Sequence, residues 1–95
     1  MSDFRDVPDE QRFEQDFPDE SGKPRTVFAD YSRRGEERAI LHVEAPMALR
    51  GSGAAGKFMQ SLANHARAEK MRLTPVCGYA VAWFRRHPDY RDVLA

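Results

Sequence analysis

Apolar residues in the first half of the chain alternate with polar ones, which is the period of β-strands. Three such stretches, residues 12–17, 26–33 and 38–45, are separated by turns that contain Gly or Pro. Alternation places the residues of the third stretch on two faces: Ala39, Leu41, Val43 and Ala45 on one, and Ile40, His42 and Glu44 on the other. The first half therefore predicts a three-stranded antiparallel meander.

The second half changes to a helical period. Between Ala54 and Lys70, apolar residues recur every three or four positions, which predicts an amphipathic helix. A short strand over residues 72–76 and a second helix over residues 79–86, ending before Pro88, complete the chain. The third strand, first helix and fourth strand predict a parallel crossover. The expected fold class is α+β: one small domain of order βββαβα, with a mixed, mostly antiparallel sheet and helices covering its apolar faces.

The first ten residues show neither period. We expect residues 1–10 to be a flexible acidic N-terminus and residues 11–95 to form one folded domain, since 95 residues leave room for only one. No apolar stretch approaches the roughly 18 residues of a membrane-spanning helix. The first twenty residues also lack the apolar core of a signal peptide. We therefore expect a cytoplasmic protein with no membrane partner.

Fifteen acids balance fifteen Lys and Arg residues, but unevenly, because residues 1–20 carry a net charge of −6 and residues 21–95 a net charge of +6. The positive part indicates an anionic ligand, although ordinary surface charge gives the same pattern. The bases are scattered and no RNA- or DNA-binding motif is present, so no nucleic acid partner is expected. The single cysteine, Cys77, excludes an internal disulfide. No Cys/His cluster has zinc spacing, so no metal site is expected.

A glycine-rich segment, residues 50–57 (RGSGAAGK), joins the third strand to the first helix. It matches G-x-G-x-x-G, but the acid that a dinucleotide fold needs about 20 residues further on is missing. It also matches G-x-x-x-x-G-K, but Phe58 stands where Ser or Thr must bind magnesium. The turn still gathers backbone N–H groups at the positive end of a helix, where a diphosphate fits and Arg50 can add a charged contact. Alternatively, its small residues only pack the helix against the sheet.

Four segments together resemble a known family: His42–Pro46 (HVEAP), Leu49–Ala55 (LRGSGAA), Pro75–Tyr79 (PVCGY) and Arg86–Tyr90 (RHPDY). The sequence is similar to the small stand-alone GNAT-type N-acetyltransferases, single domains that bind acetyl-CoA. The resemblance covers residues 12–94 and implies a GNAT-like, acetyl-CoA-binding domain. Relatives often read HTEVP in the first segment, so this chain lacks a hydroxyl at Val43.

The resemblance also implies a cofactor site. Main-chain amides of the loop would hold the CoA diphosphate, and the residues concerned are Arg50, Gly51, Ser52, Gly53, Ala54 and Ala55. The pantetheine would run along the third strand, where it diverges from the fourth, and would pair with free backbone groups near Val43. The thioester would then lie near Cys77.

Three residues are candidates for the chemistry. The resemblance implies that Cys77 either accepts the acetyl group or lies beside the CoA sulfur, and a helix start next to it would favour its thiolate. His42 is the candidate base, on the same face as Glu44, and Tyr79 could donate a proton to the sulfur. Structural alternatives are a packed Cys77 and a hydrogen-bonded sheet histidine at position 42. Four further residues are interpreted as structural: His65, Trp83, Phe84 and His87.

The leading prediction is an acetyl-CoA-dependent N-acetyltransferase that acts on an unknown amine or protein acceptor as a monomer or weak dimer. One alternative is a CoA-binding module without catalysis, because so small a domain lacks elements that enclose an acceptor. Another is an interaction domain whose glycine loop only packs. Release of free CoA separates the first two, and thermal stabilisation by acetyl-CoA separates both from the third.

Overall fold

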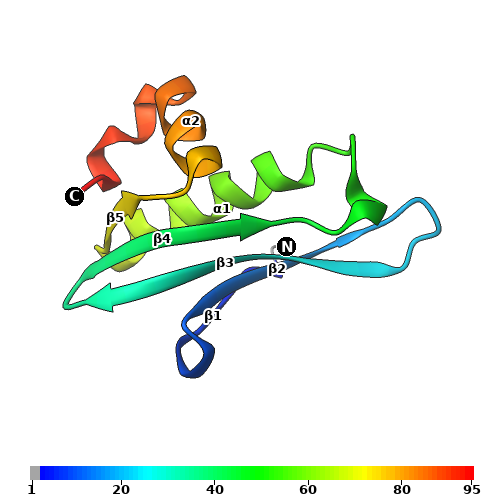
Figure 1. Ribbon diagram of the computed structural model, residues 1–95, viewed down its shortest axis with the longest axis horizontal. Helices are drawn as coiled ribbons and strands as arrows, with labels where there is room; N and C mark the ends of the chain where they lie inside the picture. Colours follow the sequence, from blue (N-terminus) through cyan, green and yellow to red (C-terminus); the bar gives the residue numbers. More distant parts are fainter. Residues whose placement is uncertain (1–2) are drawn as a thin grey trace.

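A five-stranded mixed sheet with helices on one face makes up the computed structural model, which describes residues 3–95 (Figure 1). The strands, in spatial as well as chain order, are β1 (Arg5–Val7), β2 (Arg12–Pro18), β3 (Pro24–Arg34), β4 (Glu37–Glu44) and β5 (Arg72–Pro75). The helices are α1 (Ala54–Glu69) and α2 (Gly78–Arg86), with short 3₁₀ segments η1 (Pro8–Glu10), η2 (Met47–Leu49) and η3 (Pro88–Val93). Neighbouring strands are antiparallel except β4 and β5, which are parallel, so the predicted α+β class and crossover are confirmed. Within the described residues, no helix is both long enough and apolar enough to span a membrane.

Residues 5–10 hold two elements that the sequence did not predict. β1 pairs antiparallel with β2, and η1 connects them. The Tyr31 hydroxyl donates a hydrogen bond of 2.7 Å to Asp6, and Arg5 forms ion pairs with two carboxylates of β2. These contacts hold the start of this segment against β2 and β3; the expected flexibility of residues 1–10 stays a prediction, and Met1 and Ser2 lie outside the described residues. A three-residue strand is too short to show the alternation on which that expectation relied.

The apolar core lies between the helices and one face of the sheet. Its members come from β2, β3, β4, η2, α1, β5, α2 and η3, and the largest fully buried side chains are Phe13, Val27, Ile40, Phe58, Met59, Leu62, Leu73 and Val93. Removing this apolar surface from water is the main stabilising contribution, at roughly 25 cal/mol per Å². The core therefore fixes both helices on one side of the sheet.

A bulge in β4 changes which of its side chains face the core. The β3–β4 register pairs Tyr31 with Ile40 and Asp30 with His42, so Leu41 is an extra residue without a partner in the register. Ile40 is fully buried, whereas Leu41 is 45% exposed. The predicted grouping of Ile40 with His42 and Glu44 on one face is therefore wrong: Ile40 is buried in the core and Val43 packs against it, whereas His42 and Glu44 are exposed, because one inserted residue reverses the alternation.

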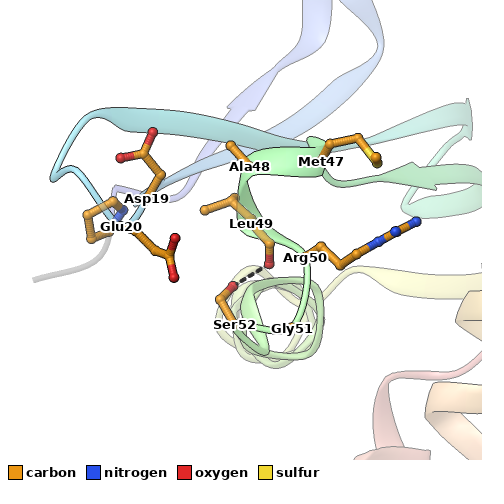
Figure 2. A pocket seen from close by; sticks show the side chains of 9 residues that line it. Asp19, Glu20, Met47, Ala48, Leu49, Arg50, Gly51 and Ser52 are labelled. Atoms are coloured by element: carbon orange, nitrogen blue, oxygen red, sulfur yellow. Dashed lines mark hydrogen bonds between the residues drawn. The ribbon is translucent and has the colours of Figure 1, made fainter.

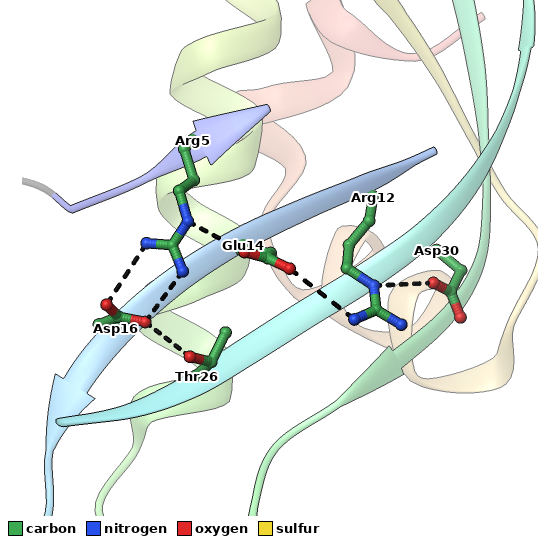
Figure 3. Close-up of polar contacts among 6 residues, drawn as sticks. All are labelled: Arg5, Arg12, Glu14, Asp16, Thr26 and Asp30. Carbon is green, nitrogen blue, oxygen red and sulfur yellow. Dashed lines mark hydrogen bonds and ion pairs between the residues drawn. The ribbon is translucent and has the colours of Figure 1, made fainter. Parts of the chain in front are cut away.

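The other face of the sheet is polar (Figure 3). A chain of ion pairs crosses it: Arg5 Nε lies 2.9 Å from Glu14 Oε1, Arg12 Nη1 lies 3.7 Å from Glu14 Oε2, and Arg12 Nε lies 3.2 Å from Asp30 Oδ1. The Arg12 guanidinium also stacks 3.9 Å from the centre of the Phe28 ring. Exposed ion pairs contribute little to stability individually. This face is therefore a solvated surface, and the packed core is confined to the helix side.

Candidate functional site

The glycine-rich segment forms the turn that leads from β4 through η2 into α1. Gly51 and Gly53 have φ angles of +78° and +79°, in the left-handed region that residues with a Cβ rarely adopt. Gly53 is the N-cap of α1, and this glycine supplies no side-chain cap. The path of the loop therefore depends on these two glycines.

The backbone N–H groups of the loop divide into two sets. Three are bonded within the protein, to Met47 O, Leu49 O and Ser52 Oγ respectively: those of Arg50, Ser52 and Ala54. Four others have no acceptor within residues 3–95: those of Gly51, Gly53, Ala55 and Gly56. Of the six residues predicted to offer their amides, only Gly51, Gly53 and Ala55 therefore have unpaired ones. Gly56 also has an unpaired amide, and sequence reasoning did not include it. The signal for Gly56 was available, because the first four amides of any helix lack intrahelical acceptors.

Packing does not explain the glycines of the loop. A Cβ added at Gly51, Gly53 or Gly56 would meet no atom within 4 Å. Their positive φ angles explain why positions 51 and 53 are glycines, but Gly56 does not have a positive φ angle. The alternative that these glycines bring the helix close to the sheet is therefore not supported, and the space beside the unpaired amides can admit a ligand.

The charges around the loop suit an anion on one side only. The first turn of α1 contains no acid, and Glu69 is the only acid between residues 45 and 88. Figure 2 shows the exposed Arg50 side chain extending away from Asp19 and Glu20. Asp19 and Glu20 line a cavity of about 450 Å³ between the loop and the β2–β3 hairpin, to which Arg50 also contributes. Asp19 is ion-paired with Arg25, so Glu20 is the carboxylate there that would repel an anion, and the Arg50 side chain points away from it.

β4 and β5 diverge after a short parallel pairing (Figure 1). β5 pairs with β4 only along residues 37–40, and the N–H groups of Val76 and Cys77 both donate to Ile40 O, at 3.0 and 3.2 Å. The chain then enters α2 at Gly78. Within the described residues, β4 has no strand neighbour on that side beyond Ile40, so its last four residues present a free backbone edge.

The bulge decides which backbone groups point to this free edge. The Tyr31 N–H donates to Gln11 O beside β2, so odd-numbered residues of β3 direct their peptide groups toward β2 and even-numbered ones toward β4. The even-numbered residues lie opposite His42 and Glu44, which therefore bond to β3. Val43 lies between them and directs its N–H and C=O to the free edge. Its backbone can thus pair with an added chain, and this pairing needs no hydroxyl.

Cys77 lies where β4 and β5 diverge and is the N-cap of α2. Its Sγ accepts a hydrogen bond from the Ala80 N–H at 3.4 Å. The side chain is half-buried and packs against the core. The expected helix start beside Cys77 is present, and the residue caps the helix in addition to packing.

The chain matches a known protein family. A family model described as GCN5-related N-acetyl-transferase matches residues 12–93. The chain belongs to this family. A search of curated proteins finds no match. The GCN5-related fold is seen in the solution NMR structure of a GCN5-like protein from Staphylococcus aureus, with a TM-score of 0.62 and 20% identity over 97% of this chain and 86% of that one. The resemblance and fold predicted from the sequence are confirmed.

In this GCN5-related domain, Tyr79 lies beside Cys77 and His42 does not. Tyr79 is in the first turn of α2 and is 40% exposed. Burial raises the pKa of its phenol above the usual value of 10.0, and the nearby positive charge of Arg86 partly opposes this rise. His42 is exposed, and its Nε2 lies 3.0 Å from Glu44 Oε1, so the predicted shared face of these two residues is present. No hydrogen bond or ring contact within residues 3–95 joins His42 to the start of α2.

The residues interpreted as structural have packing partners. Trp83 and Phe84 are buried, and the His87 ring stacks on Trp83 with its Nδ1 2.7 Å from the Trp83 carbonyl oxygen, at the end of α2. The His65 ring lies 5.0 Å from that of Phe4. Within residues 3–95, no group of three or more His, Cys, Asp or Glu side chains is arranged to hold a metal ion. The three candidate residues lie in two places: Cys77 and Tyr79 are at the start of α2, and His42 is on the exposed end of β4.

Proposed function

We propose that this GCN5-related domain binds acetyl-CoA and transfers the acetyl group to an amine. The observation that carries the proposal is the set of four unpaired amides, Gly51, Gly53, Ala55 and Gly56, at the positive end of α1. Such a set is a ready-made site for phosphate oxygens, and the open space beside Gly56 lets a ligand approach the backbone. Arg50, on the side away from the nearby carboxylates, adds a cation that can bond to the diphosphate.

The free edge of β4 offers a place for the pantetheine arm of acetyl-CoA. The pantetheine arm of CoA contains amide groups, and the exposed N–H and C=O of Val43 could pair with them as an added strand would. One end of this edge leads through η2 to the glycine loop, and the other reaches Ile40, which Cys77 contacts. The edge thus connects the proposed phosphate site with the start of α2.

When bound, acetyl-CoA supplies an acetyl group activated as a thioester. The protein must accept a proton from the acceptor amine and supply one to the sulfur. Nε2 of His42 faces Glu44 Oε1, and in the tautomer that carries its proton on Nε2 the other ring nitrogen, Nδ1, accepts the proton of the amine. Tyr79 carries a proton to donate, because a phenol with a pKa at or above 10.0 is protonated at neutral pH.

Cys77 is proposed to act at the sulfur end, either by accepting the acetyl group on Sγ or by lying beside the CoA sulfur. The Ala80 N–H donates to Sγ, which lies at the positive end of α2. The proposal keeps the predicted cytoplasmic location and a monomer or weak dimer.

Product formation tests the proposal. The full chain is incubated with acetyl-CoA and a panel of small amines, polyamines and lysine-containing peptides, and free CoA and acetylated amine are separated and quantified. We expect both products in equal amounts, dependent on protein and on one class of amine. Acetyl-CoA binding without product would leave a CoA-binding module, and the absence of binding would refute the whole proposal.

A further inference from the structure

Exposed apolar side chains gather where β4 and β5 diverge. Within residues 3–95, the large apolar side chains that are exposed are Leu41, Met47, Val76 and Tyr79. Leu41 directly follows the last residue of β4 that pairs with β5, and Val76 directly follows the last residue of β5. Tyr79 is three residues further along, in the first turn of α2. Only Met47, in η2, lies in another part of the fold. Exposed apolar side chains that cluster in this way mark a surface that binds a ligand or a partner.

Leu41 and Val76 form an apolar pair on the polar face of the sheet. The parallel register pairs Ile40 with Pro75, and the Val76 N–H donates to Ile40 O at 3.0 Å, so Leu41 and Val76 are the next residues on the two neighbouring chains. Ile40 is buried in the core, and Pro75 lines a hollow against α2. Because successive side chains of a strand point to opposite faces, Leu41 and Val76 point away from the helices. Their exposure agrees with this direction.

The bulge brings the candidate base to the same face as the apolar pair. His42 lies opposite Asp30, which belongs to the ion pairs of the polar face (Figure 3). Because Leu41 is the extra residue of the bulge, Leu41 and His42 are consecutive in the chain and are both exposed. Glu44 is also exposed, and its Oε1 lies 3.0 Å from His42 Nε2. The apolar pair therefore adjoins a candidate base and a carboxylate.

The acceptor has one open route to the place where the strands diverge. The helix side is filled by the core, in which Ile40, Ala80 and Phe84 are buried. With the pantetheine arm along the free edge of β4, the acceptor approaches over the polar face. A simple amine with a pKa of roughly 10 is a cation at neutral pH, so the Glu44 carboxylate attracts it. The carbon atoms next to the amine then meet the apolar pair.

We infer that the acceptor is a primary amine on an apolar stem, with the stem packed on Leu41 and Val76 and the nitrogen directed to His42 and Glu44. This inference rests on the proposed function and names its class of acceptor. A free alkylamine has such a stem, and so does a peptide lysine with an apolar neighbour. The experiment separates these two sources.

Steady-state kinetics with matched acceptors and saturating acetyl-CoA tests the inference on the full chain. The first pair is hexylamine and 6-aminohexanol, which differ only by a terminal hydroxyl. The second pair is two lysine peptides that differ only by a leucine or a serine next to the lysine. We expect about tenfold higher kcat/KM for the apolar member of one pair, at the low end of the discrimination that apolar contacts give. The difference should lie in KM, because the stem contact is the same before and during the reaction. The pair that shows it identifies the source.

A double variant removes the apolar pair and keeps the size of its side chains. In Leu41→Gln combined with Val76→Thr, we expect the preference to fall below about twofold, because the apolar contact is lost. The kcat/KM for the polar member of the pair should stay unchanged, which shows that the variant is folded and active. Met47→Gln is the matched control, because Met47 is also an exposed apolar side chain but lies in η2. It should keep the full preference.

The kinetic results decide the inference in either direction. Equal kcat/KM within both pairs overturns it, as does a preference that survives in the double variant or that Met47→Gln removes to the same extent. The proposed function fails differently, because the unchanged protein would then form no acetylated product from any of the four acceptors.

Discussion

At the scale of single residues, Cys77 has a capping role and a proposed chemical one, and two substitutions separate them. Cys77→Ser keeps an acceptor for the Ala80 N–H, whereas Cys77→Ala removes it. We expect Cys77→Ala to lower the free energy of unfolding by about 1 kcal/mol, the usual cost of a lost N-cap, and Cys77→Ser to lower it less. Denaturant unfolding of the two variants measures this difference.

The same pair tests the covalent role of the sulfur. If Sγ accepts the acetyl group, both variants lose acetyl transfer while their affinity for acetyl-CoA stays within a few-fold, since neither substitution touches the glycine loop. Full transfer activity in Cys77→Ala would remove Cys77 from the chemistry and leave it as a cap and a packing residue.

Residue types in the sequence were sufficient to locate the loop but not to assign its hydrogen bonds. Gly51, Gly53 and the position of Cys77 before a helix could be read from the sequence. The sequence could not show that the Ser52 hydroxyl oxygen accepts a hydrogen bond from the Ala54 N–H, because a serine in such a turn can bond to several neighbours. The unpaired set of amides, including Gly56, emerges only from the folded loop.

At the scale of elements, periodicity predicted β2, β3, β4, α1, β5 and α2 to within two residues at each end. Each of these elements buries one face, so apolar residues recur along it at a regular spacing that the sequence shows. β1 was missed because three residues carry too little pattern, and its pairing depends on contacts with β2 and Tyr31. The bulge at Leu41 was missed because no residue type requires it. It nevertheless directs the backbone of Val43 to the free edge.

The hydrogen bond from Tyr31 of β3 to Asp6 of β1 should make the stability of the protein depend on pH. Burial, followed by the hydrogen bond to Asp6, raises the pKa of Tyr31 to about 12. The unfolded phenol has a pKa of roughly 10, so the folded protein holds this proton more tightly. The associated stability is complete below pH ~10 and is lost as the pH rises through about 12.

We therefore expect the free energy of unfolding to fall between pH ~10 and ~12, and to fall less steeply in Tyr31→Phe, which has no proton to lose. Urea unfolding at several pH values over this range measures both slopes. Equal slopes in the two proteins would show that Tyr31 does not carry the pH dependence. Measurements at pH ~8 serve as the control, because the phenol is protonated in both states there.

At the scale of the whole molecule, the acidic and basic residues are concentrated in different parts of the fold. Residues 1–44, which form four strands of the sheet, contain twelve acids and seven Lys or Arg residues, whereas residues 45–88 contain one acid and seven Lys or Arg residues. The segment with both helices is thus the positive part, and the polar face of the sheet carries paired charges (Figure 3). The sequence indicates this segregation, but only the fold shows that Arg50 turns away from Asp19.

The central claim is that the unpaired amides of the glycine loop hold the diphosphate of acetyl-CoA. Titration of the ¹⁵N-labelled chain with acetyl-CoA, followed by NMR, tests it most directly. We predict saturable shifts of the amide signals of Gly51, Gly53, Ala55 and Gly56, with those of β1 and β2 unchanged. Saturation elsewhere on the protein, with these four signals unmoved, would contradict the account.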